Sequence, residues 1–302
     1  MTATMELLRR KITSAKDLQS VVRTMKAMAA SNVGRFEQAA QALDEYSRTV
    51  KQGLGICLRE GCGEDWLPAE KDPATPEEDT VAGAVVFGSD QGLVGRFNEV
   101  VAEVAITTLG KTENTPPVWA VGERMFEHLR NAGLPLEGFF AVPGNVAAIS
   151  PLVGQVLMRG ENRLGPGQTV RLHLFYCRRD TDARPAPVHT RLLPAGRLWL
   201  HELAGRPWPT RTLPEILGER DTAFRALVRE YLFVSLFRAC AESLASENAS
   251  RLEAMQRAER NIDDLLSGLN GQFHQVRQSG IDEELFDVVS GFKALSNGHR
   301  KG

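Results

Sequence analysis

The N-terminal arm of the chain, residues 8–57, has the sequence LRRKITSAKDLQSVVRTMKAMAASNVGRFEQAAQALDEYSRTVKQGLGIC. Its apolar residues recur at every seventh position, at Leu8, Ala15, Val22, Ala29, Phe36, Leu43, Val50 and Cys57. A companion row runs beside them through Leu18, Met25, Asn32, Ala39 and Tyr46. A repeat sustained over this length is typical of a coiled-coil helix. At 1.5 Å per residue, such a helix would be roughly 75 Å long.

The C-terminal arm carries the same repeat. One row consists of Val234, Ala241, Asn248, Met255, Ile262, Leu269 and Val276. The row beside it consists of Phe237, Leu244, Leu252, Ala258 with Glu259, Leu265 and Phe273. Because a long helix with one apolar stripe needs a partner, we expect the two arms to pair as an antiparallel coiled coil. The alternative is two surface helices of an ordinary globular domain, but average helices of about 11–12 residues are much shorter than these repeats.

Proline is confined to the middle of the chain, because all 15 prolines lie between Pro68 and Pro214. Since proline disrupts helix interiors at a cost of roughly 3 kcal/mol, this distribution predicts two long helices around a globular centre. The predicted segments are an N-terminal helix over residues 1–60, an acidic linker over 61–80, a central domain over 81–195, a second linker over 196–214 and a C-terminal helix over 215–302.

The central segment alternates short apolar runs with helical stretches. We expect strands at Val81–Phe87, Val118–Gly122, Thr169–Cys177 and Val188–Leu193. We expect helices at Asn98–Leu109, Glu123–Asn131 and Pro151–Met158. This alternation indicates a small Rossmann-like α/β domain. The predicted fold class is therefore a long antiparallel coiled coil of the terminal helices plus a central Rossmann-like α/β domain.

The composition excludes several classes of protein. A net charge of −2 is unlike the basic field of a nucleic-acid-binding protein. No run reaches the roughly 18 apolar residues of a membrane span, and the N-terminus lacks the pattern of a signal peptide. The four cysteines form no C-x-x-C motif, which favours reduced thiols in the cytosol. A disulfide between Cys57 and Cys62 is left open.

No motif in the chain predicts catalysis. The turn from Gly88 to Asn98 follows a strand, where α/β proteins bind phosphates, but it contains neither a P-loop nor a G-x-G-x-x-G motif. After His201 and Glu202, Gly205 stands where a zinc-binding H-E-x-x-H motif needs its second histidine. We therefore expect no catalytic residue, no cofactor and no metal ion.

Both arms contain motifs of a known family. The stretches RRKITSAKDLQSVVRTMKAMAAS, SLASENASRLEAMQRAERNIDDL and VRQSGIDEELFDVVSGFKAL resemble the opening and closing helices of the γ subunit of F-type ATP synthases. The turn GSDQGLVGRFN resembles that family's first strand and turn. Gln91, Val94 and Arg96 depart from the family's usual residues, and Asn32–Gly34 replace part of a basic stretch. These departures are compatible with a divergent or alternative-type F-ATPase.

The resemblance implies a rotating central shaft that couples transmembrane ion flow to ATP synthesis or hydrolysis at the β subunits. The implied contacts with β are Arg277, Gln278, Arg251, Met25 and Lys26. The implied bearing segment at the end of the shaft contains Leu285, Val288, Val289 and Leu295. The basic character of residues 1–35, with seven Lys and Arg against Glu6 and Asp17, suits acidic partner loops.

The implied partners are the α, β and ε subunits and the membrane c-ring, with no nucleic acid and no membrane span of the chain's own. The implied location is the cytoplasmic face of the energy-transducing inner membrane. Two other functions are left open. A coiled-coil scaffold with an α/β head would self-associate without α and β, and a nucleotide-dependent enzyme would bind ATP or NAD as the isolated chain.

Overall fold

The computed structural model describes residues 2–62, 82–110, 116–161, 171–180, 184–193, 197–208, 210–212 and 214–298. Most of the predicted acidic linker, residues 61–80, lies outside these ranges. The chain divides into two compact units. The first unit comprises residues 1–28 and 252–302, and the second comprises residues 29–251.

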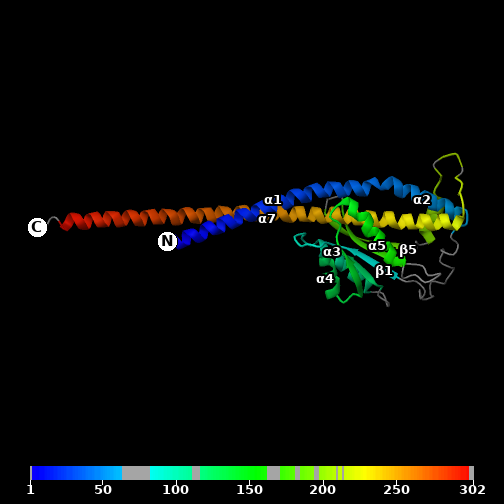
Figure 1. Ribbon diagram of the computed structural model, residues 1–302, viewed down its shortest axis with the longest axis horizontal. Coiled ribbons are helices and arrows are strands. Elements are labelled where there is room, and N and C mark those ends of the chain that lie inside the picture. The colour runs from blue at the N-terminus through cyan, green and yellow to red at the C-terminus, as the bar shows by residue number, and fades with distance from the viewer. Residues whose placement is uncertain are drawn as a thin grey trace. The chain divides into compact units, whose positions relative to one another are not determined.

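Three helices make up the two arms. Helix α1 spans Thr2–Ala42, α2 spans Asp44–Arg59, and α7 spans Arg220–Gly298 and is 79 residues long (Figure 1). A turn at Leu43 separates α1 from α2, and the Ser47 amide still donates to the Leu43 carbonyl at 2.8 Å. The helices are this long because the arms contain no proline.

In the first unit, the ends of α1 and α7 pair in antiparallel fashion. Leu8, Ala15, Met255 and Leu269 are buried, at 7%, 2%, 1% and 8% exposure. Arg23 and Lys26 both contact Glu259, and Gln19 donates to the Asp263 carboxylate. From Gln19 to Lys26 the residue number rises along α1, while the partner on α7 falls from Asp263 to Glu259. This order confirms the predicted antiparallel coiled coil.

The companion rows are only partly buried. Leu18 is 58% exposed and Leu265 is 54% exposed, whereas Leu266 is buried. Met25, Asn32 and Ala39 of the predicted companion row are half-buried. On the other side of the main seam, which is the row that contains Leu8 and Ala15, a second half-buried row runs through Met5, Ile12, Gln19 and Lys26. Sequence reasoning missed this row because two of its members are polar, and their burial depends on the acidic partners that α7 supplies.

The second unit is built on a five-stranded sheet. Its strands are β1 Ala82–Phe87, β2 Val118–Val121, β3 Leu136–Phe140, β4 Arg171–Arg179 and β5 Pro185–Leu193. The order is β3-β2-β1-β4-β5, and every neighbouring pair is parallel except β4 with β5. This confirms the α/β centre. β3 was not predicted, because Glu137 and Gly138 interrupt a short apolar run.

Helices cover both faces of this sheet (Figure 1). Helices α3, Phe97–Leu109, and α4, Glu123–Asn131, pack on one face around Phe97, Met125 and Phe175. The other face packs on α5, Ile149–Glu161, which follows the short 3₁₀ helix Val146–Ala148, and on the parts of α1 and α7 within this unit. The sheet and the segments of the two arms within this unit therefore share one core, which includes Phe36 and Leu236.

A smaller apolar cluster joins the last turns of α2 to the start of α7. It also includes α6, Arg197–Gly205, which lies within the predicted linker over 196–214. The buried members of the cluster are Val50, Leu54, Cys57, Cys62, Leu203, Phe224 and Val228. Helix α6 lies close to α2, because a Cβ on Gly55 would meet the Leu203 carbonyl oxygen at 2.4 Å. Among the described residues, no helix combines the length and hydropathy needed to cross a membrane.

Candidate functional site

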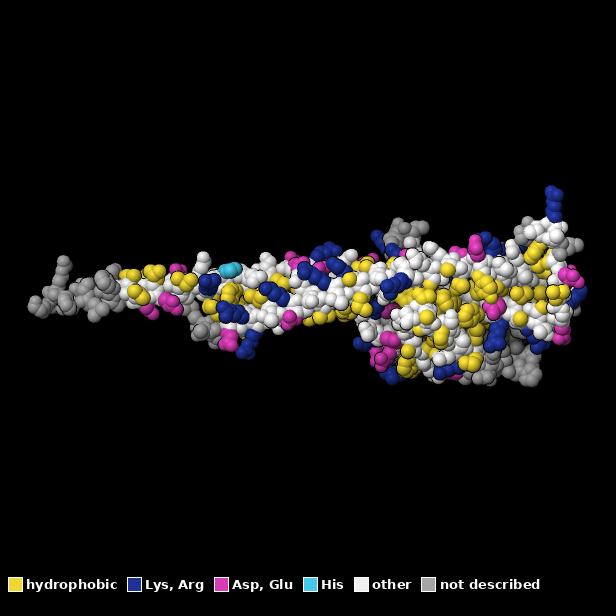
Figure 2. Space-filling model, turned by 45° about the horizontal axis from the view of Figure 1, so that its top comes forward, with side chains coloured by type: hydrophobic (Ala, Val, Ile, Leu, Met, Phe, Trp, Pro, Cys, Tyr) yellow, Lys and Arg dark blue, Asp and Glu magenta, His cyan; other side chains and the backbone are white. Residues whose placement is uncertain are grey.

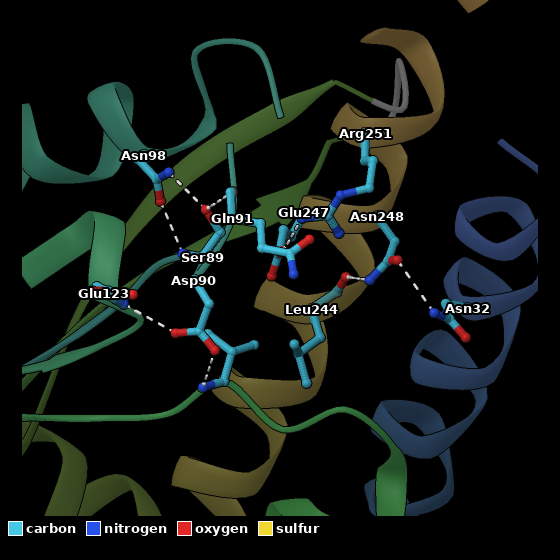
Figure 3. Close-up of polar contacts among 11 residues, drawn as sticks. Asn32, Ser89, Asp90, Gln91, Asn98, Glu123, Leu244, Glu247, Asn248 and Arg251 are labelled. Carbon is cyan, nitrogen blue, oxygen red and sulfur yellow. Dashed lines mark hydrogen bonds and ion pairs between the residues drawn. The ribbon is translucent and has the colours of Figure 1, made fainter. Parts of the chain in front are cut away.

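The turn that follows β1 is held by its own side chains (Figure 3). Asn98 accepts from the Ser89 amide at 2.9 Å and donates to Ser89 Oγ at 2.7 Å. Ser89 Oγ donates to the Gln91 carbonyl at 2.8 Å. A Cβ on Gly88 would lie 2.4 Å from Met125 Cβ, so this strand end accepts only glycine without repacking. These contacts place the next residue, Asp90, in a fixed position.

Asp90 connects three segments of the α/β domain. Its Oδ1 accepts from the Glu123 amide at the start of α4, and its Oδ2 accepts from the Val142 amide after β3, both at 3.0 Å (Figure 3). A carboxylate is favourable at a helix N-terminus because the free amides and the helix dipole both attract negative charge. Asp90 therefore organises the edge of the sheet formed by the strand ends.

Helix α7 is buried on all sides where it passes this turn. Every residue from 243 to 250 is buried. The run includes Ser243, Ala245, Ser246, Ala249 and Ser250, and these short side chains allow close approach on more than one side of the helix. On the α1 side, the Asn32 side chain donates to Asn248 Oδ1 at 3.5 Å, and Asn248 donates to the Leu244 carbonyl at 2.8 Å.

Glu247 is the charged residue of this run. Its side chain is 5% exposed and is bonded to Arg251, 15% exposed, at 2.7 Å. Burial raises the pKa of Glu247, the Arg251 guanidinium opposes that rise, and Asp90 adds to it. The Gln91 side chain points toward the same carboxylate (Figure 3). The turn after β1 and α7 thus form a single polar junction, which we call the Glu247 junction: Asp90, Gln91, Glu247 and Arg251.

The turn after β1 and Arg251 were both predicted from the sequence, Arg251 as a partner contact, but Glu247 was not. The arginine does form a contact, with Glu247 of its own helix. The spacing of four residues between Glu247 and Arg251 was the available signal, but the burial that makes the pair important depends on the tertiary fold.

The other predicted contact residues lie in the first unit. Arg277 and Gln278 are exposed on α7, whereas Met25 and Lys26 on α1 are half-buried. The Lys26 side chain is 35% exposed, and its ammonium contacts Glu259. Arg277 and Gln278 are therefore available on the helix surface, and Lys26 contributes to the pairing of the two helices.

The predicted bearing segment is an apolar stretch near the end of α7. Leu285, Phe286 and Val288 are 60%, 72% and 72% exposed, and Val289 is 42% exposed. Leu295 belongs to α7, but its side chain lies outside the described residues. Figure 2 shows hydrophobic side chains interleaved with acidic ones in this region. Exposed large apolar residues in such a row indicate a contact surface.

Within the described ranges, no group of three or more His, Cys, Asp and Glu side chains is placed to hold a metal ion. A cleft of about 340 Å³ lies between α1, α2, the end of β4 and α7. Its charged lining pairs internally, with Arg238 bonded to Asp44 and Glu242 and Arg179 bonded to Glu37. The acidic and basic side chains that line this cleft are equal in number, so its net charge is close to zero.

Comparison with known proteins agrees with the geometry. A family model described as ATP synthase matches residues 4–295, and the chain belongs to that family. Its relatives include the ATP synthase gamma chain of Granulibacter bethesdensis, 28% identical over 302 residues, with 97% of this chain and 100% of the relative covered. The ATP synthase gamma chain of Mycolicibacterium paratuberculosis is 28% identical over 311 residues, with 98% and 99% covered.

Solved structures share the fold. A chain of the Euglena gracilis mitochondrial ATP synthase in rotational state 3, from the OSCP/F1/c-ring structure, superposes with a TM-score of 0.69 at 18% identity and covers 100% of this chain and 98% of its own length. A chain from the central stalk and c-ring structure of the Tetrahymena thermophila mitochondrial enzyme gives a TM-score of 0.55 at 23% identity, covering 79% and 99%. The likeness extends over the helical arms and the α/β domain together.

Proposed function

We propose that this chain is the central rotor shaft, the gamma subunit, of an F-type ATP synthase, and that it has no active site of its own. The observation that carries the proposal is the 79-residue helix α7 paired antiparallel with α1, in a chain whose family match spans residues 4–295. A rigid pair of helices can transmit torque without catalysing a reaction. The enzyme activity of the complex would then reside in the β subunits.

The mechanism follows from the asymmetry of the helical pair. A pair of different helices presents a different surface to each of three identical β subunits. Each orientation therefore biases each β subunit toward a different nucleotide state, by the difference in contact free energy between those states. Turning the shaft moves these biases around the ring. Ion flow through the membrane ring would drive the rotation, and ATP hydrolysis would reverse it.

Exposed apolar residues on α1 supply part of that surface. Leu7, Leu18, Val21 and Met28 are 54%, 58%, 56% and 61% exposed. They recur at helical spacing on the side of α1 that does not face the main seam. A monomeric coiled coil has no need of a second apolar stripe, so the stripe favours a surrounding partner. We propose the inner surface of an α and β ring.

The remaining contacts are proposed along α7 and the α/β domain. Arg277, Gln278 and Arg251, with Met25 and Lys26, would contact β, and the segment from Leu285 to Leu295 would turn in an apolar sleeve at the end of the ring. The α/β domain would bind the ε subunit and the polar loops of the c-ring. The chain would then be a peripheral subunit at the cytoplasmic face of the inner membrane.

The shaft role is tested by interrupting either helix. Proline in place of Val22 or Ile262, both half-buried in the first unit, removes a backbone hydrogen bond and kinks the helix. We expect Val22→Pro and Ile262→Pro complexes to bind ATP on β but to lose ion-coupled ATP synthesis. Val22→Ala and Ile262→Ala are the matched controls and should retain coupling. Synthesis at the control rate in the proline variants would contradict the shaft role.

The proposed β contacts are tested on the exposed part of α7. Arg277→Ala with Gln278→Ala should reduce ATP-driven ion pumping more than ATP hydrolysis, because these side chains would transmit torque rather than catalyse. Arg260→Ala with Gln275→Ala changes the same residue types at other exposed positions of the helix and is the control. Equal pumping by the two double variants would show that Arg277 and Gln278 only face solvent.

The two other functions are tested with the isolated chain and by co-purification. Assembly with α, β and ε on co-expression supports the proposal. Stable self-association without these subunits would support a scaffold, and ATP or NAD binding in calorimetry would support a nucleotide-dependent enzyme.

A further inference from the structure

The end of α2 brings two cysteines together. The Cys62 amide donates to the Cys57 carbonyl at 2.9 Å, and the Gly61 amide donates to the Leu58 carbonyl at 3.3 Å. Gly61 has a φ of +75°, the left-handed conformation that glycine adopts readily. These features define a Schellman cap, in which the residue after the left-handed glycine contacts the residue five positions earlier in the helix. Here both of those residues are cysteines.

The two thiols are in direct contact. Cys57 and Cys62 are hydrogen-bonded through their side chains, and both are unoxidised in the structure. Cys57 is 1% exposed and Cys62 is 3% exposed. They pack with Leu203 of α6 and Phe224 and Val228 of α7. The pair therefore lies where three helices of the second unit meet, and a bond between its sulfur atoms would close a short loop within the cap.

We propose that Cys57 and Cys62 form a dithiol modification site, which a low-molecular-weight disulfide converts into an intramolecular disulfide. The proposal goes beyond the shaft function and does not depend on it. It concerns the fixed geometry of a helix cap, which places the second thiol beside the first. After one cysteine reacts, this proximity favours ring closure over release of the modified thiol.

The exchange is balanced in atoms and electrons. The Cys62 thiol loses a proton, and its sulfur attacks one sulfur of the small disulfide, releasing a thiolate and leaving a mixed disulfide on Cys62. Cys57 then loses its proton, and its sulfur attacks the Cys62 sulfur and releases the second small thiolate. Each released thiolate takes up a proton. The protein loses two electrons and two protons, and the small disulfide is reduced to two thiols.

Burial controls the rate of this exchange. Burial raises the pKa of Cys57 to about 11, so the thiolate is scarce at neutral pH while the cap is closed. Opening of the cap hydrogen bonds at Gly61 and Cys62 exposes the pair, as helix ends open more readily than helix centres. The rate should therefore rise with pH and with mild denaturant. Cys177 and Cys240 are also buried and serve as internal controls.

Peptide mapping tests the proposal on the full chain. The reduced protein is incubated with oxidised glutathione, the remaining thiols are alkylated, and the protein is digested with trypsin. Cleavage after Lys51, Arg59 and Lys71 separates Gln52–Arg59 from Glu60–Lys71. We expect these two peptides to be joined by a bond that reductant cleaves, with a total mass lower by two hydrogen atoms than the sum of the reduced peptides. Cys177 and Cys240 should be alkylated.

Two variants complete the test. In Cys57→Ala the second step has no attacking thiol, so we expect Cys62 to accumulate as the glutathione mixed disulfide. In Cys177→Ala the crosslink should form as in the unaltered chain. Separate glutathione adducts on Cys57 and Cys62 of the unaltered chain would overturn the proposal. So would full alkylation of both after exposure at raised pH, or a crosslink to Cys177 or Cys240.

Discussion

Replacing Arg251 by alanine should destabilise the chain in a strongly pH-dependent way. The Glu247 side chain is 5% exposed, and its carboxylate is bonded to Arg251 at 2.7 Å. Removing one partner of a buried ion pair typically costs about 3–5 kcal/mol. Glu247 can avoid part of that cost by taking up a proton. Its ordinary pKa is 4.5, and each pH unit is worth about 1.4 kcal/mol, so at pH 7 protonation limits the loss to at most about 3 kcal/mol.

The sign of the pH dependence follows from linkage. Burial raises the folded-state pKa of Glu247, and loss of Arg251 raises it further. A raised carboxyl pKa costs nothing below the unfolded value of 4.5, and the cost grows as pH rises from there to the folded pKa. The difference in free energy of unfolding between the unaltered chain and Arg251→Ala should therefore be largest near pH 8 and nearly vanish near pH 4.5.

The assay is urea-induced unfolding of the full chain at pH 5, 6, 7 and 8, with pH 4.5 added where the chain stays folded. Arg251→Ala is compared with the double variant Glu247→Gln and Arg251→Ala, which should recover most of the loss at pH 8. Arg257→Ala is the matched control, because Arg257 pairs with Glu253 at the same spacing on α7 but both side chains are more than half exposed. It should lose at most about 0.5 kcal/mol.

Either of two results would refute this reasoning. One is an equal loss for Arg251→Ala at pH 5 and pH 8. The other is a double variant that is as unstable as Arg251→Ala at pH 8.

Four further variants test other parts of the structure. Gly122→Ala should cost more than about 2 kcal/mol in unfolding measurements, because φ is +104° and the new Cβ would lie 2.7 Å from Ser89 backbone atoms; Gly133→Ala, with φ +78° and open space, should cost roughly 1 kcal/mol. Asp90→Ala should cost about 1–3 kcal/mol by leaving two backbone amides without acceptors, and an unchanged urea midpoint would contradict this. Lys26 and Arg23 lower the pKa of Glu259. The stabilisation that ionised Glu259 gives the fold should therefore be lost as pH falls below 4.5. The free energy of unfolding of Glu259→Gln should not show this loss.

The helical arms could be predicted because the apolar residues at every seventh position of one arm can be recognised without knowing what the arm packs against. Leu8, Ala15 and Met255 are apolar and buried, so pattern and burial agree. The flanking row could not be read in the same way. Lys26 can be half-buried because its ammonium pairs with the Glu259 carboxylate. That partner lies on α7, far away in the sequence.

The α/β domain shows the same division between local and long-range information. Its continuous apolar strands, such as Val118–Val121, were predictable because parallel strands are buried on both faces. Strand β3 was not, because its pattern is short and broken by Gly138. Helix α6 was not predicted either, because it lies within the predicted linker over 196–214.

Of the candidate site, the turn after β1 could be predicted from the sequence, but the Glu247 junction could not. Gly88, Ser89 and Asp90 form a recognisable signal after a strand. Glu247 lies in a helix whose surroundings only the fold determines. Its importance comes from burial beside the turn after β1, which no local pattern encodes.

Rotation of the chain within its assembled complex tests the central claim most directly. Glu103 is exposed on α3, so Glu103→Cys offers a site to attach a bead while the α and β ring is fixed to a surface. The shaft proposal predicts stepwise rotation of the bead in one direction that requires ATP. Sustained ATP hydrolysis by the fixed complex while the bead on this chain stays still would contradict it.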